Sequence, residues 1–295
     1  MEMVQPRTWD EALAAKADEP RLLPIAGGTD VMVELNFDRR RPVGLLDLTR
    51  IDELAAWHVE DGHVLLGAGV PYAVVVSDLA ELLPGLAMAS RTVGSPQIRN
   101  RGTVGGNLGS ASPAGDAHPP LLAGRAVVEV GSVRGAREIP VTEFFTGVKR
   151  SALRPDELIR AIRVPVASGP QQFAKIGTRN AMVIAVCSFG LALHPDRQSV
   201  GAAVGSAAPT PVLATDAEEL LTQELGSSNL WASRARLPES VVRRFGELVA
   251  AAANPIDDVR GTAAYRRHAL AVMARRTLTW AWADYQRDGT GEAAG

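Results

Sequence analysis

The stretch Ile98-Arg99-Asn100-Arg101-Gly102-Thr103-Val104-Gly105-Gly106-Asn107 is the most informative part of this chain. It lies in a glycine-rich region, residues 95–115, whose residues are too small and polar for a core, so we expect a loop. Paired glycines permit positive φ and let backbone N–H groups converge, and such a nest binds anions, including a pyrophosphate. Asp116 ends the region, where its carboxylate can accept hydrogen bonds from ribose hydroxyls.

A second glycine pair occurs earlier, in the segment Pro24-Ile25-Ala26-Gly27-Gly28-Thr29-Asp30. The apolar residues before it predict a short strand over 22–26, and Thr29 adds a hydroxyl donor. Taken singly, each glycine pair is most often an ordinary turn. Two such loops, each following a predicted strand, together favour a nucleotide cofactor.

The common nucleotide-binding fingerprints are missing from this sequence. No G-x-G-x-x-G follows a predicted strand, and the pattern G-x-x-x-x-G-K-[ST] does not occur. A Rossmann site and a P-loop are therefore both disfavoured.

Length and composition indicate an ordinary globular protein. The chain has 295 residues, 46% hydrophobic and 22% charged, enough for two modest domains or one large one. A net charge of -2 gives no electrostatic signal for nucleic acid or an anionic membrane. The longest apolar run, residues 181–193, is too short for a membrane span, and the N-terminus lacks a signal-peptide core. We expect a soluble, cytoplasmic protein.

The sequence contains no recognisable catalytic residues and no metal site. Its single cysteine, Cys187, rules out an internal disulfide framework and a self-contained thiolate-held iron–sulfur cluster. The five histidines are scattered, without metal-ligand spacing, and are best interpreted as structural. If the protein is an enzyme, a cofactor is expected to carry the chemistry.

Hydrophobic patterning predicts an α+β protein with a boundary near residue 168. The first part is predicted to contain strands at 43–48, 64–70, 126–130, 138–141 and 157–164, with helices at 72–83 and from 119. Residues 84 and 85, Pro-Gly, are expected to end the first of these helices. A linker is expected at 165–170. The second part is predicted to contain strands at 173–176, 183–193 and 199–207, then helices at 215–225, 238–253 and 263–285.

With both loops in view, the sequence resembles the FAD-binding medium subunits of molybdenum hydroxylases, the relatives of xanthine dehydrogenase and carbon monoxide dehydrogenase. Residues 98–116 resemble that family's "IRN-x-GT-x-GGN" run and the Ser-Pro and Asp that follow it. Further along, Phe173-x-Lys175-x-x-x-Arg179, residues 203–214 and Tyr265-Arg266-Arg267-His268 are similar to other stretches of the family. The resemblance spans nearly the whole chain.

The resemblance implies an FAD-binding domain of the vanillyl-alcohol-oxidase (PCMH) type at 1–168, made of two α/β subdomains. It implies a smaller α/β sandwich domain at 169–287, with a short antiparallel sheet and helices, and a flexible tail at 288–295. It places the FAD pyrophosphate against both glycine loops, the ribityl or ribose hydroxyls at Asp116, and the isoalloxazine near Ile159 and Lys175. The implied cofactor-binding residues are Ile25, Ala26, Gly27, Gly28, Thr29, Asp30, Val31, Thr103, Val104, Gly105, Gly106, Asn107, Asp116, Ile159 and Lys175.

The resemblance also implies partners. An iron–sulfur subunit with two [2Fe–2S] clusters would supply electrons to the FAD of this chain, and a large molybdopterin subunit would oxidise the substrate. The electrons would leave to NAD+, a quinone or oxygen. The sequence departs from the xanthine dehydrogenase branch at Val93, where an aromatic residue is frequent, and at Met182 and Val183, where acidic residues follow the arginine. The final electron acceptor therefore stays open.

Two other functions remain as alternatives. The chain could be a stand-alone FAD-dependent dehydrogenase or oxidase of a small metabolite. It could also be a non-enzymatic binding module whose glycine loops are ordinary turns. Flavin content and co-purifying chains distinguish the three.

Overall fold

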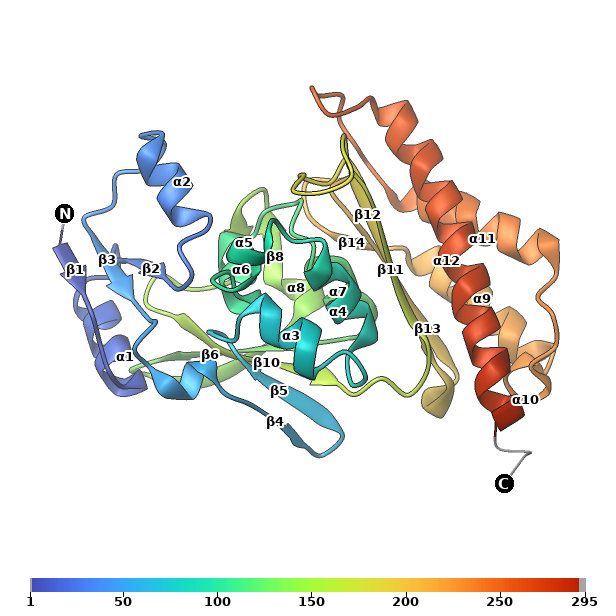
Figure 1. Cartoon of the computed structure of the whole chain (residues 1–295), viewed down its shortest axis with the longest axis horizontal. Helices are drawn as coiled ribbons and strands as arrows, with labels where there is room; N and C mark the ends of the chain where they lie inside the picture. The colour runs from blue at the N-terminus through green and yellow to red at the C-terminus, as the bar shows by residue number, and fades with distance from the viewer. Residues whose placement is uncertain (1, 292–295) are drawn as a thin grey trace.

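The computed structural model describes residues 2–291, and within them three sheets of three or more strands follow one another along the molecule (Figure 1). The first is a parallel sheet with strand order β1-β3-β2. Its elements are β1 (Glu2–Val4), α1 (Trp9–Asp18), β2 (Leu23–Ile25), α2 (Val31–Asn36) and β3 (Gly44–Asp47). This N-terminal subdomain has a small core of its own between the sheet and α2, formed by Leu23, Ile25 and Leu45.

The second sheet is antiparallel, with strand order β4-β5-β10-β6-β7, and it supports the helices at the centre of the molecule (Figure 1). Its strands are β4 (Trp57–Glu60), β5 (His63–Gly67), β6 (Val127–Ser132), β7 (Gly135–Pro140) and β10 (Leu158–Pro165). The helices are η1 (Asp52–Ala55), α3 (Tyr72–Asp78), α4 (Pro84–Arg91), α5 (Pro96–Arg99), α6 (Val104–Ser110), α7 (His118–Ala123) and α8 (Val141–Phe144). A short hairpin, β8 (Phe145–Gly147) and β9 (Arg150–Ser151), completes this subdomain.

The third sheet is antiparallel, with strand order β11-β12-β13-β14, and three long helices pack on it (Figure 1). Its strands are β11 (Gln171–Ile176), β12 (Cys187–His194), β13 (Ser199–Gly205) and β14 (Val212–Leu213), with η2 (Pro195–Arg197) between β12 and β13. The helices are α9 (Thr215–Ser227), α10 (Leu230–Ser233), α11 (Glu239–Ala252) and α12 (Ala263–Gly291). A second large core lies between this sheet and the helices.

Helix α7 of the central subdomain packs against β12 and β13 of the third sheet. Two glycines make this close approach fit. A Cβ on Gly190 would lie 2.8 Å from the backbone of Pro119, and one on Gly201 would lie 2.0 Å from the carbonyl oxygen of Ala123. Both glycines lie where a helix backbone rests directly on the strands, a close approach that excludes a side chain.

The prediction of a loop over residues 95–115 is wrong, because this region contains α5 and α6. Ser95 caps α5, since its hydroxyl accepts a hydrogen bond from the N–H of Ile98, and Pro96 occupies the first helical position. Thr103 caps α6 in the same way. The prediction for Pro84 is also wrong, because α3 ends at Asp78 and Pro84 begins α4. Capping hydroxyls and prolines at the first helical position therefore start helices here, even though the segment is rich in glycine.

At the C-terminal end, α12 continues to Gly291. The tail predicted at 288–295 therefore overlaps the helix at residues 288–291, and residues 292–295 lie outside the described part of the chain. In residues 2–291, no helix is both long and apolar enough to cross a membrane.

Candidate cofactor site

The two glycine loops lie against each other. Gly27 follows β2, and a Cβ built on it would lie 1.8 Å from the carbonyl oxygen of Arg101. The space beside Gly27 is thus filled by the backbone of the second loop. Gly28 has a φ of +74°, in the left-handed region that favours glycine, and its carbonyl oxygen accepts a hydrogen bond from Met32 N as α2 begins.

The second loop is the start of α6. The hydroxyl of Thr103 accepts a hydrogen bond from Gly106 N at 2.8 Å, and Val104 and Leu108 are buried in the central core. A Cβ on Gly105 would lie 2.5 Å from the carbonyl oxygen of Ala68. The side of Gly106 is open, because only the Thr103 hydroxyl lies within 4 Å of its Cβ position.

Asp116 and Lys175 form a buried ion pair between the two domains. Lys175 Nζ lies 2.6 Å from Asp116 Oδ2, with side-chain exposures of only 7% and 9%. The ammonium group also donates to Thr92 O at 3.3 Å, and the Thr92 hydroxyl donates to the same carboxylate oxygen at 3.3 Å. Burial raises the pKa of Asp116 above its usual value, and the charge of Lys175 opposes this shift. The structure thus joins two residues that the resemblance implied separately.

Buried polar atoms without a hydrogen-bond partner gather around these segments. Among the described residues, Tyr72 OH, Asn107 Oδ1, Asp116 Oδ1 and His118 Nδ1 are such atoms in this part of the molecule, whereas Trp231 Nε1 and Arg266 Nε lie in the C-terminal domain. An unpaired buried polar group costs about 1–3 kcal/mol, so such atoms usually indicate an absent ligand or water. Hydroxyl groups of FAD could donate to Asn107 Oδ1 and Asp116 Oδ1, and a phosphate or hydroxyl oxygen could accept from Tyr72 OH. The open side of Gly106 leaves room for a close approach. The residues present therefore fit FAD.

Ile159 and the remaining predicted residues lie around this group. Ile159 on β10 is 8% exposed, and its Cδ1 would be 3.9 Å from a Cβ on Gly109 in α6. Asp30 is exposed at the N-terminal end of α2, and Val31 packs against the small N-terminal core. Thr29 lies beside the second loop, because a Cβ on Gly102 would be 3.4 Å from its hydroxyl oxygen.

His118 contacts the second loop from the protein interior. It is fully buried, its ring lies 4.5 Å from that of Phe145, and its Nε2 is 3.3 Å from Asn107 O. Burial lowers the pKa of His118 to about 4, so the ring is neutral near pH 7.

Reactive and metal-binding groups are not part of this arrangement. Burial raises the pKa of the Cys187 thiol to about 12, which makes it unreactive as a nucleophile. Over residues 2–291, no cluster of three or more histidine, cysteine or acidic side chains has a geometry that could hold a metal ion.

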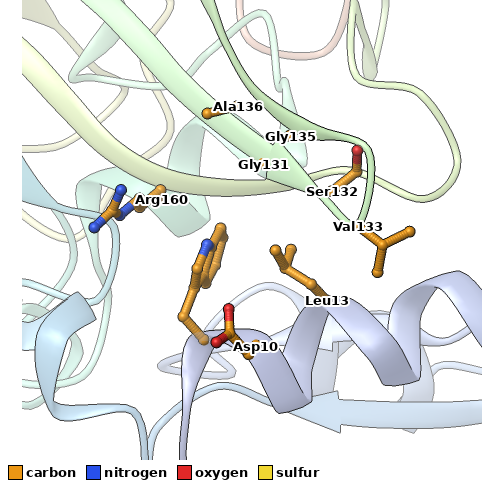
Figure 2. Close-up of a pocket in the computed structure, with 9 residues that line it drawn as sticks. Asp10, Leu13, Gly131, Ser132, Val133, Gly135, Ala136 and Arg160 are labelled. Carbon is orange, nitrogen blue, oxygen red and sulfur yellow. The ribbon is translucent and has the colours of Figure 1, made fainter.

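A cavity of about 390 Å³ lies elsewhere, between α1 and the β6–β7 hairpin (Figure 2). Trp9, Asp10 and Leu13 line it from α1, and Arg160 lines it from β10. None of the predicted cofactor-binding residues borders it. The candidate site is thus defined by the glycine loops and their unpaired polar atoms.

The fold and this site define a two-domain α+β protein built to bind a dinucleotide cofactor. Residues 1–167 match the family described as the FAD binding domain in molybdopterin dehydrogenase. Residues 172–281 match the CO dehydrogenase flavoprotein C-terminal domain. The chain belongs to the family of FAD-binding subunits of molybdenum hydroxylases, which confirms the resemblance, the fold class and the cofactor.

Individual relatives agree with this assignment. The chain is 34% identical over 209 residues to the nicotinate dehydrogenase FAD-subunit of Eubacterium barkeri, covering 68% of this chain and 70% of the relative. It is 30% identical over 268 residues to the carbon monoxide dehydrogenase medium chain of Afipia carboxidovorans, covering 86% and 87%. A carbon monoxide dehydrogenase structure from Hydrogenophaga pseudoflava superposes with a TM-score of 0.87 at 26% identity, covering 96% of this chain and 98% of that one.

Proposed function

We propose that this chain is the electron-transferring flavoprotein of a multi-subunit molybdenum hydroxylase. In this role it takes electrons from a [2Fe–2S] subunit and delivers them to NAD+, a quinone or oxygen, while a large molybdopterin subunit oxidises the substrate. The observation that carries the proposal is that the two glycine loops contact each other in a region that also holds buried polar atoms without a hydrogen-bond partner. The single cysteine supports the division of labour, because the iron–sulfur clusters need thiolates from another chain.

Bound FAD would supply the redox chemistry, accepting and releasing electrons. The protein's part is to bind and orient it. The backbone N–H of Gly28 and the hydroxyls of Thr29 and Thr103 would hold the diphosphate. The Gly106 N–H is already bonded to the Thr103 hydroxyl, so Gly106 would contribute only the open side that lets the cofactor approach. The Asn107 amide would contact a neighbouring oxygen of the cofactor.

The buried pair of Asp116 and Lys175 would hold the C-terminal domain against the cofactor. Because Asp116 Oδ2 is already bonded to Lys175, only Oδ1 remains to accept a cofactor hydroxyl. Ile159 would supply an apolar contact to the isoalloxazine. Among the described residues, we assign none a role as acid, base or nucleophile in this function.

A reconstitution experiment tests the proposal. The chain is produced with its neighbouring genes' products and purified, and flavin, iron and molybdenum are measured in the complex. Reduction of the flavin by substrate through the complex, and not by substrate with the isolated chain, is the expected result. Substrate turnover by the isolated flavoprotein would instead establish a stand-alone dehydrogenase or oxidase.

Addition of NAD+, a quinone or oxygen to the reduced complex then identifies the acceptor. We also propose a cytoplasmic location, which fractionation of the producing cells tests.

A further inference from the structure

Tyr72 carries a buried hydroxyl group that the protein does not satisfy. The residue begins α3 and is 2% exposed, and its OH is among the buried polar atoms without a partner. Its backbone is well anchored, because Tyr72 N donates to Gly102 O at 3.0 Å. A buried phenol without a partner costs about 1–3 kcal/mol relative to one that is hydrogen-bonded. A phenylalanine would pack equally well here and avoid that cost.

The position of Tyr72 links the segments of the cofactor site. A Cβ on Gly102 would lie 3.5 Å from Cδ2 of Tyr72 and 3.4 Å from the hydroxyl of Thr29, so the ring lies at the junction of the two loops. Burial and the negative charges of Asp116 and Asp30 raise the pKa of the Tyr72 phenol well above its ordinary value. The group is therefore a neutral O–H donor near pH 7.

Tyr285 shows how this fold treats a buried phenol that has only a structural role. It is 6% exposed, similar to Tyr72, but its OH donates to the carbonyl oxygen of Trp231 at 2.8 Å. Of these two buried phenols, only that of Tyr285 has a protein acceptor. That difference points to an acceptor for Tyr72 that comes from outside the chain.

We propose that Tyr72 is a cofactor-binding residue whose hydroxyl donates a hydrogen bond to an oxygen of FAD between the two glycine loops. The proposal rests on FAD binding by this chain and adds a donor from α3, a segment outside both glycine motifs. The acceptor would be an oxygen of the diphosphate or of the adjoining ribityl chain, because those are the parts of FAD that glycine loops contact.

Substitution of Tyr72 by phenylalanine tests this without removing any packing. The full-length chain, freed of flavin, is titrated with FAD and its dissociation constant is measured, and the thermal midpoint of the apoprotein is measured separately. For Tyr72→Phe, we expect the dissociation constant to rise about 5- to 50-fold, the loss of one hydrogen bond. The apoprotein midpoint should stay the same or rise, because an unpaired hydroxyl has been removed.

Tyr285→Phe is the matched control. It should leave FAD affinity unchanged and lower the apoprotein midpoint, because a satisfied hydrogen bond is lost. If Tyr72→Phe behaves like this control, with a lower midpoint and unchanged affinity, a buried water holds the hydroxyl and the proposal is overturned. Unchanged affinity with an unchanged midpoint also overturns it. If the wild-type chain itself takes up no FAD, the proposed function fails, which this titration reports separately from the effect of Tyr72.

Discussion

The two glycine loops look alike in the sequence but are held in place very differently. The first, residues 26–30, connects a three-stranded sheet to α2, a helix with no buried residue. The second begins α6, whose Val104 and Leu108 are fully buried in the main core. The second loop is therefore held in place by the main core. The first loop has no such anchor and is positioned by its contact with the second.

Within each pair, the two glycines also have different tasks. Gly27 and Gly105 are required because the protein's own backbone occupies the place of a side chain. Gly28 is required for its left-handed backbone, and Gly106 leaves an open face. Of these four glycines, only Gly106 has an open side, so in the second motif one glycine serves packing and the other is available to a cofactor.

The largest expected effect comes from adding a methyl group at the two packing glycines. Gly105→Ala places a Cβ against Ala68 inside the main core, and we expect a loss of more than about 4 kcal/mol in the free energy of unfolding. Gly27→Ala separates the loops and should expose the N-terminal subdomain while the rest stays folded. Urea unfolding together with hydrogen exchange of residues 2–50 separates these outcomes. Equal exchange throughout both variants would contradict the difference between the loops.

The second loop is also tied to the C-terminal domain, and the ion pair tests that connection. Asp116→Asn leaves the Lys175 ammonium buried without its counter-charge, so we expect a loss of roughly 3 kcal/mol in stability. Lys175→Met together with Asp116→Asn should recover much of this loss, because no charge remains buried. Urea unfolding of the single and double variants measures the coupling. Additive losses would show that the two residues are not paired in solution.

These contrasts explain which parts of the structure the sequence could predict. Strands β11, β12 and β13 of the third sheet lie near the predicted ranges 173–176, 183–193 and 199–207, because their residues are mostly apolar or small. The two-residue strand β14 is too short to give a pattern and is not among the predictions. The loop predicted at 95–115 is wrong, because the capping hydroxyls of Ser95 and Thr103 start two helices in spite of the glycine content. The helix end predicted at Pro84 is wrong because proline is equally suited to the first turn of a helix, and Pro84 begins α4.

The candidate site was predictable only in its motifs. Both glycine pairs were identified from local sequence, and the family resemblance supplied Asp116 and Lys175. The pairing of these two residues depends on a contact across 59 positions, which no local pattern encodes. Tyr72 was missed for the same reason, because a tyrosine after Pro71 has no signal until Gly102 and Thr29 are seen beside it. Its only sequence cue is a polar aromatic residue within an otherwise apolar helix start.

Low pH should lower the free energy of unfolding through protonation of His118, the buried histidine that contacts the second loop. Because the pKa of His118 falls from 6.5 to about 4 on folding, its stabilising contribution is complete above pH 6.5 and is lost as the pH falls toward 4. This difference corresponds to about 3 kcal/mol. His194, with a pKa also near 4, adds a similar loss in the third sheet. Unfolding free energies at pH 6.5, 5 and 4 should therefore fall less steeply in His118→Met than in the wild type. Parallel profiles would remove His118 from this role.

The smallest expected effect tests the open face itself. Gly106→Ala adds a methyl group whose only near neighbour is the Thr103 hydroxyl, at 3.0 Å, and alanine is favoured over glycine within a helix by up to about 1 kcal/mol. Apoprotein stability should therefore be unchanged or slightly higher. The methyl group blocks close approach to the backbone, so FAD affinity should fall about tenfold, or ~1.4 kcal/mol.

Gly226→Ala in α9 is the matched control, because its Cβ position has no neighbour within 4 Å and lies outside the site. Both variants are compared by FAD titration and urea unfolding. If Gly106→Ala binds FAD as tightly as Gly226→Ala, the open face of the second loop is not the cofactor's side, and the functional half of the contrast between the loops is lost.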